Sequence, residues 1–148
     1  MARGKRLINR EISWLYFNER VLQEAMDESN PIIERLKFLG IFSNNRDEYF
    51  QVRVATIKRM VQIEKKKEIK PNEPAEKILA EILSTVEEQE KKFTSTFVKI
   101  LKELKKQNIV FLNDAQLKKK QGEFVQKFFR YEVVPNLFPI MLKSLENP

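Results

Sequence analysis

One long stripe of core-forming residues, from Ile78 to Leu104, constrains the fold of this sequence more than any other feature. No Gly or Pro interrupts the segment, and the positions of the stripe are three or four residues apart. That spacing predicts a single helix of roughly thirty residues that packs against its neighbours in the manner of a coiled coil. The stripe runs through Ile78, Ile82, Val86, Gln89, Phe93, Phe97, Ile100 and Leu104.

Three shorter helices are expected before the long one. Apolar residues recur at helical spacing over residues 13–26, and Ser13 is a candidate N-cap. An Asn-Pro pair at residues 30–31 signals the start of a second helix, because Asn caps well and Pro fits the first turn. The second helix should end within residues 40–43, and the third should begin at about Asn45.

The four helices together predict an all-α N-domain, similar to a four-helix bundle, over residues 1–107. The pattern then changes, because the short apolar run at residues 109–112 is bounded by asparagines and is typical of a strand. A helix capped within residues 113–114 should follow it, and residues 139–148 resemble a connector. We therefore expect residues 108–148 to be a strand-helix fragment, the beginning of a second domain.

Missing residue types exclude most independent chemistry. The chain contains no Cys and no His, so disulfides, thiolate metal sites and the Ser-His-Asp and Cys-His catalytic arrangements are absent. Its three glycines are too far apart for a phosphate-binding loop. No apolar run is long enough to cross a membrane, and the basic N-terminus lacks the apolar region of a signal peptide. These features predict a cytoplasmic protein.

A net charge of +7 favours anionic partners, such as nucleotides, phosphates, nucleic acid or acidic lipid at a membrane surface. Four cations, Arg46, Arg53, Lys58 and Arg59, fall on one predicted helix. No recognition-helix, RNP-like or zinc-finger pattern accompanies them, which speaks against nucleic acid as the main partner. A basic helical module that binds RNA or a partner helix is the alternative function that the composition leaves open.

The stretch Ser43-Asn44-Asn45 allows two interpretations. Asn45 followed by Glu48 fits a capping box, and Asn44 could close the preceding helix in the left-handed conformation. In the other interpretation, an amide side chain is held there to recognise a ligand. Spacing alone favours capping.

Three segments carry a resemblance to a known family. Residues 11–22, 31–45 and 47–55 closely resemble the amino-terminal region of bacterial polyphosphate kinases, and the segment from residue 108 onward is similar to the family's transition into its head domain. The resemblance implies a parent enzyme several times longer than this chain. Such enzymes transfer the terminal phosphate of ATP to polyphosphate, and back, through a phosphohistidine with Mg²⁺. Since the histidine and metal ligands lie in the carboxy-terminal domains, the chain alone should be inactive.

The resemblance also implies a role for an amide side chain in the stretch Ser43-Asn44-Asn45. The matching asparagine is Asn45, which would contact the adenine of ATP, with Ser43, Asn44 and Arg46 as candidate neighbours. A carboxamide offers a donor and an acceptor side by side, as adenine requires. Arg46 departs from the family, which often has Leu there. The implied partners are the remaining domains, ATP or ADP, polyphosphate and a second copy of the enzyme.

Other prominent side chains are expected to be structural. Aromatic residues at helical spacing usually form a core, which is the prediction for Trp14, Phe17, Phe38 and Phe50. Two arginines in the family-like segments, Arg35 and Arg53, either approach phosphate or pair with carboxylates, and pairing is favoured. The expected carboxylate partners are Glu11, Glu19, Asp47 and Glu48.

Overall fold

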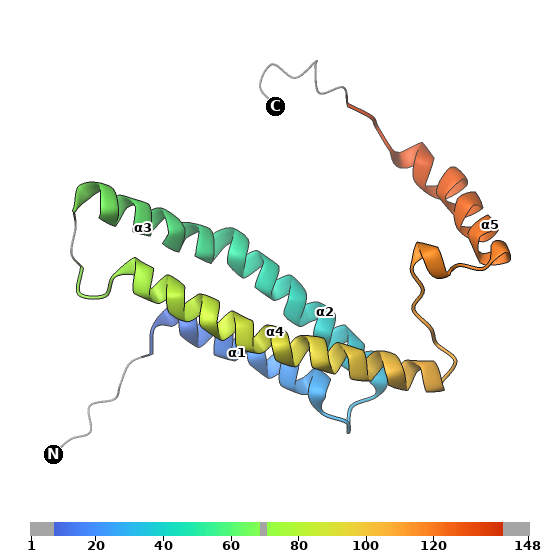
Figure 1. Ribbon diagram of the computed structural model, residues 1–148, viewed down its shortest axis with the longest axis horizontal. Coiled ribbons are helices and arrows are strands. Elements are labelled where there is room, and N and C mark those ends of the chain that lie inside the picture. The colour runs from blue at the N-terminus through green and yellow to red at the C-terminus, as the bar shows by residue number, and fades with distance from the viewer. Residues whose placement is uncertain (1–7, 69–70, 141–148) are drawn as a thin grey trace. The chain divides into compact units, whose positions relative to one another are not determined.

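The computed structural model describes residues 8–68 and 71–140, and the chain divides into two compact units, residues 1–109 and 110–148. The first unit contains the helices α1, α2, α3 and α4, drawn from blue to yellow in Figure 1. The prediction of an all-α fold with one long helix is confirmed. The described residues contain no strand and no helix long and apolar enough to cross a membrane.

Helix α1 spans Arg10–Met26 and begins three residues before the predicted start. Its N-cap is Asn9, whose side-chain oxygen accepts a hydrogen bond of 2.9 Å from the backbone N–H of Glu11. The prediction of Ser13 as the cap was wrong, because Asn9 satisfies that role and Ser13 already bonds back to the carbonyl of Asn9. Asn and Ser cap about equally well, so composition could not choose between them.

Helix α2 spans Ile32–Tyr49 and runs straight through the stretch that was predicted to break it. The backbone of Arg35 bonds back to the carbonyl of Pro31, so α2 follows Pro31, and Asn30 instead donates to the carbonyl of Glu24. A π-helical turn, Phe50–Val54, then leads directly into helix α3, Ala55–Lys67. The predicted end at residues 40–43 and the predicted restart at Asn45 were therefore both wrong.

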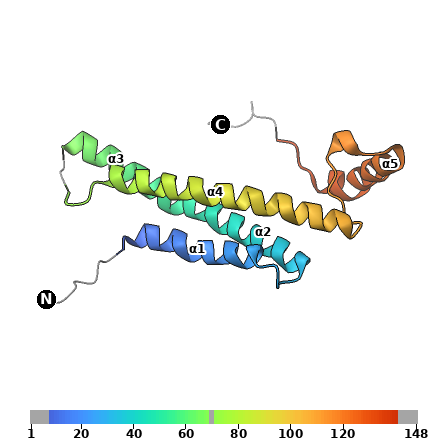
Figure 2. The same ribbon diagram turned by 60° about the horizontal axis from the view of Figure 1, so that its bottom comes forward.

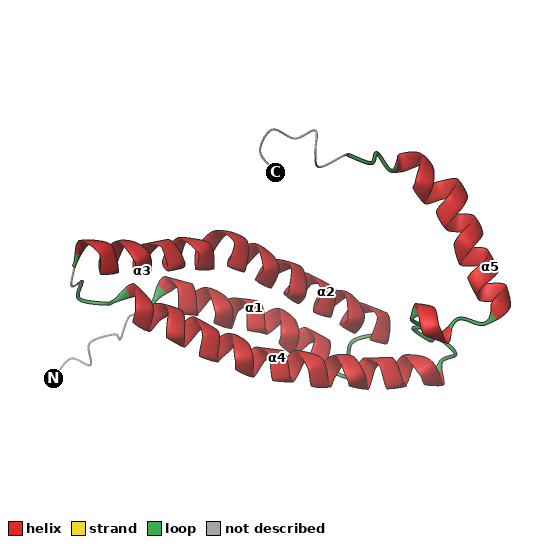
Figure 3. Ribbon diagram, turned by 45° about the horizontal axis from the view of Figure 1, so that its top comes forward, coloured by secondary structure: helices red, strands yellow, loops and turns green. Residues whose placement is uncertain are grey.

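Burial explains why the helix continues. Phe42 and Tyr49 lie on either side of the polar stretch and are both buried, so core packing holds the backbone helical on each side of it. The helix propensities of Ser and Asn are only modestly unfavourable, and tertiary packing readily overrides them. Figure 3 shows α2 and α3 as one continuous rod of helix.

Helix α4, Ala75–Lys106, is the predicted long helix and contacts α1, α2 and α3. Figure 2 shows it running the length of the first unit beside them. Two buried clusters form the core along it. The first cluster contains Ile12, Leu15, Tyr49, Val54, Ile57, Ala75, Ile78 and Ile82, and the second contains Leu22, Ala25, Leu39, Phe42, Ile100 and Leu104.

The predicted strand at residues 109–112, where the second unit begins, does not form, because a strand needs a partner and the described residues provide none. Asn113 caps a 3₁₀ turn, Asp114–Gln116, and helix α5 follows at Lys119–Phe128. A π turn, Phe129–Val133, and a 3₁₀ turn, Val134–Asn136, complete the helical part. Most of the predicted connector, residues 141–148, lies outside the described residues.

Candidate functional site

A chain of three polar groups joins α1 to α2 at Asn45. The Asn45 side chain donates a hydrogen bond of 2.9 Å from Nδ2 to Oδ1 of Asn18. Asn18, which is only 1% exposed, donates in turn from its own Nδ2 to the carbonyl of Phe42, at 3.1 Å. Since Asn45 lies in the middle of a helix, it cannot be an N-cap, and the capping interpretation of the stretch was wrong.

The Phe42 carbonyl, at the end of this series of hydrogen bonds, fixes which way each amide points. A backbone carbonyl can only accept, so Asn18 must turn its NH₂ group toward Phe42 and its oxygen toward Asn45. Asn45 must then turn its own NH₂ group toward Asn18. Within the described residues, the second N–H and the oxygen of Asn45 have no other partner. The exposed part of the amide thus offers one donor and one acceptor.

Asn45 borders an open pocket of about 420 Å³ between α1, α2 and the π turn. Helix α1 contributes two aromatic side chains, α2 contributes three residues and the π turn contributes two. A π turn carries one more residue per turn than an α-helix, which changes the residues that face α1 after Tyr49. The lining residues are Trp14, Phe17, Asn45, Glu48, Tyr49, Val52 and Arg53.

Two of the four predicted core aromatics face this pocket. Phe17 is 67% exposed, so its assignment to the core was wrong. Trp14 is half-buried and stacks on Tyr49, with ring centroids 4.5 Å apart and planes within 8° of parallel. Phe38 and Phe50 are partly buried against the two core clusters. The pocket therefore has an aromatic floor next to an amide.

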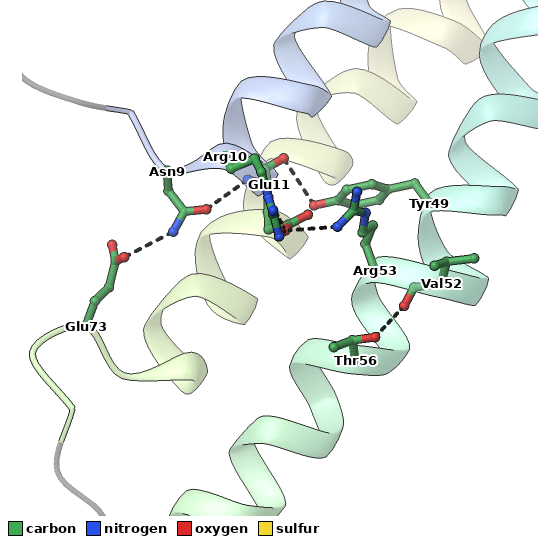
Figure 4. Close-up of polar contacts among 8 residues, drawn as sticks. All are labelled: Asn9, Arg10, Glu11, Tyr49, Val52, Arg53, Thr56 and Glu73. Carbon is green, nitrogen blue, oxygen red and sulfur yellow. Dashed lines mark hydrogen bonds and ion pairs between the residues drawn. The ribbon is translucent and has the colours of Figure 1, made fainter.

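A charged cluster borders the same pocket, and Figure 4 shows how its side chains converge on Glu11. Arg10 Nη2 lies 3.0 Å from Glu11 Oε1, and Arg53 Nη1 lies 3.8 Å from the same oxygen. The hydroxyl of Tyr49 donates to the backbone carbonyl of Glu11, at 3.2 Å. Burial, and then the negative charge of Glu11, raise the pKa of Tyr49 to about 12. Tyr49 is thus a neutral hydrogen-bond donor.

The structure also locates the two arginines that were expected to pair. Arg53 pairs with Glu11, as predicted, and its exposed guanidinium still borders the pocket. Arg35 is buried, donates to the carbonyl of Ala25 and pairs with Glu103 of α4 at 2.8 Å. That partner was not among the predicted carboxylates.

The candidate neighbours of Asn45 do not line its pocket. Asn44 is exposed and Ser43 is half-buried, and neither borders the pocket. Successive residues of a helix point about 100° apart, so Arg46 faces α4 instead. There it pairs with Glu90 and lies 5.5 Å from the ring centroids of Phe42 and Phe93. Glu48 and Val52 were missed because a helix break was predicted here. Continuing the three- and four-residue spacing from Asn45 would have placed both of them on its face of the helix.

Within residues 8–68 and 71–140, no three His, Cys, Asp or Glu side chains lie close enough together to hold a metal ion. We assign no Mg²⁺ ligand in this chain.

Comparison with known proteins gives a consistent result. The family profile described as Polyphosphate kinase N-terminal domain matches residues 7–112. A polyphosphate kinase of Vibrio parahaemolyticus is 38% identical over 144 residues, which cover 97% of this chain and 20% of that protein. One from an Exiguobacterium species is 46% identical over 141 residues, which cover 92% of this chain and 19% of that protein.

A solved structure matches as well. The crystal structure of polyphosphate kinase from Porphyromonas gingivalis superposes with a TM-score of 0.64 at 32% identity, covering 94% of this chain and 20% of that one. The chain thus spans about a fifth of the length of the relatives that it matches.

Proposed function

This chain belongs to the polyphosphate kinase family, and we propose that it is the N-terminal part of a longer enzyme in which it forms one wall of the ATP site. The parent enzyme would transfer the terminal phosphate of ATP to polyphosphate. The sequence contains no histidine, so the phosphohistidine of that reaction, and the ligands of Mg²⁺, would come from the rest of the enzyme. The partners would be those domains, a second copy of the enzyme, ATP or ADP, and polyphosphate, in the cytoplasm.

The arrangement around Asn45 carries the proposal. The pocket's volume of about 420 Å³ lies in the range typical of small-ligand sites, about 300–1,000 Å³. The rings of Trp14 and Phe17 border it and offer flat surfaces on which a purine can stack. The free donor and acceptor of Asn45 match the amino group and a ring nitrogen of adenine.

Arg53, the cation that lines the pocket, is suited to the phosphates of the nucleotide rather than to its base. Arg53 is held by Glu11, but its side chain is 47% exposed and carries donors that Glu11 does not use. An arginine cannot supply the acceptor that the adenine amino group needs, so Asn45 is the residue to which we assign base recognition. One wall with no phosphate cradle would bind ATP weakly until the other domains close the site.

The test is Asn45→Ser in the full-length enzyme that carries this domain. Serine is too short to offer the paired donor and acceptor, so KM for ATP should rise about tenfold, which corresponds to about 1.4 kcal/mol of lost recognition. The turnover number should change less, since the base is remote from the transferred phosphate.

Asn44→Ser is the matched control, because Asn44 is exposed on the same helix and does not border the pocket. It should leave KM for ATP unchanged. Melting temperatures of both variants separate loss of binding from loss of folded enzyme. If Asn45→Ser leaves KM for ATP at the wild-type value, the adenine contact is wrong.

A further inference from the structure

The buried residue Asn18 is well placed to control which purine bases the Asn45 amide can recognise. It lies on α1, outside the set of residues that line the pocket, and is 1% exposed. Both of its polar atoms are engaged, one with the Phe42 carbonyl and one with the Asn45 amide. A leucine would fill a similar volume and favour the helix more, so packing alone does not call for an amide here.

An amide that is free to rotate can read two different bases. Turning it by 180° exchanges its donor and its acceptor, and so inverts the pattern that it presents. Adenine has an amino donor at position 6, whereas hypoxanthine and guanine have a carbonyl acceptor there. An Asn45 held in one orientation can therefore match only one of these two kinds of purine.

We infer that Asn18 is a positioning residue that locks the amide orientation of Asn45 and thereby sets the preference for adenine over 6-oxopurines. The inference rests on the proposed contact between Asn45 and adenine. The Phe42 carbonyl can only accept, so its hydrogen bond of 3.1 Å fixes the orientation of the Asn18 amide. The Asn18 oxygen then fixes the orientation of the Asn45 amide through a hydrogen bond of 2.9 Å. Asn18 itself contacts no substrate.

The experiment compares ATP with inosine triphosphate in the full-length enzyme. The two nucleotides carry the same ribose and phosphates and differ only on the base at position 6 and the adjoining ring nitrogen. The quantity measured is the ratio of kcat/KM for ATP to kcat/KM for inosine triphosphate. A purely structural defect would lower both values together and leave the ratio unchanged.

Asn18→Leu removes the acceptor that orients Asn45 and should lower the ratio about fivefold, the equilibrium factor of one net hydrogen bond. Asn18→Ala removes the same acceptor with a smaller side chain, and should also lower the ratio if the leucine variant folds poorly. Asn18→Asp is the matched control. It keeps an oxygen for Asn45 in either protonation state, so the ratio should stay within about twofold of wild type.

Asn45→Ser separates the inference from the function on which it rests. If Asn45→Ser lowers the ratio but neither Asn18→Leu nor Asn18→Ala does, Asn18 does not act as a lock, while the adenine contact stands. An equal loss in Asn18→Asp and Asn18→Leu would also overturn the lock. If Asn45→Ser leaves the ratio at the wild-type value, the adenine contact itself fails, and the role of Asn18 fails with it.

Discussion

The indole of Trp14 lies flat on the ring of Tyr49, with centroids 4.5 Å apart and planes within 8° of parallel. This stack joins α1 to the last residue of α2 and borders the pocket beside Asn45. Trp14 is also the single tryptophan of the sequence. Its fluorescence is therefore a probe of this pocket.

Adding ATP to the chain should change the Trp14 fluorescence with a midpoint on the order of millimolar, because one wall of a site supplies only about 4 kcal/mol of binding. A fluorescence titration measures it. Tripolyphosphate is the control and should have little effect, since it has no base to stack in the pocket. A micromolar midpoint would mean that the site is nearly complete in this chain, contrary to our proposal.

Tyr49 should make stability depend on alkaline pH. Folding raises its pKa from 10 to about 12, so between these values the folded state holds more protons than the unfolded state. The contribution of this raised pKa to the stability of the folded state is complete below pH 10 and is lost as the pH rises through 12. It amounts to at most about 2.7 kcal/mol, from about 1.36 kcal/mol for each tenfold change in the proton affinity.

The variant for that test is Tyr49→Phe, which keeps the ring and removes the ionising group. Its stability at neutral pH should fall by about 1 kcal/mol, because the hydrogen bond to the Glu11 carbonyl is lost. Between pH 10 and 12, its free energy of unfolding should decline less steeply than that of wild type, as urea denaturation can measure. Parallel curves over this range would contradict the raised pKa.

The sequence pattern predicted the long helix well because burial repeats along it at one helical period. Ile78, Ile82, Ile100 and Leu104 were all expected to face its neighbours, and all are buried. The same pattern predicts an all-α unit without knowledge of tertiary contacts. It failed at Ser43-Asn44-Asn45, where local propensity suggested a break. The buried side chains of Phe42 and Tyr49, seven residues apart, would have indicated two turns of continuous helix.

Contacts between distant residues could not be predicted in this way. Asn18 and Asn45 are 27 positions apart, and their hydrogen bond depends on how α1 packs against α2. Arg35 and Glu103 are 68 positions apart, and only the packing of α4 brings them together. Sequence therefore indicated Asn45 through the family resemblance, whereas its orientation and its aromatic neighbours required the structure.

The pair of Arg35 and Glu103 should matter more for stability than the surface pairs. Arg35 has a side chain only 4% exposed, and it also donates to the Ala25 carbonyl at the end of α1. Arg35→Ala should lower the free energy of unfolding by about 2 kcal/mol, because the Ala25 carbonyl loses its buried donor and the packing of the Arg35 side chain is lost. Lys37→Ala is the control on the same helix. Its pair with Glu34 is exposed and should contribute less than about 1 kcal/mol. Equal losses in urea denaturation would show that Arg35 acts as a surface residue.

The last prediction concerns phosphate transfer. The chain has no histidine, so it lacks the side chain that would carry the phosphoryl group in the proposed parent reaction. Incubation with γ-labelled ATP and Mg²⁺ should leave the chain unlabelled, because proximity of a nucleotide does not supply a missing nucleophile. The full-length enzyme under the same conditions should acquire an acid-labile, alkali-stable label, as a phosphohistidine does. Stoichiometric labelling of the chain alone would place a phosphoryl acceptor within these 148 residues and overturn the proposed division of labour.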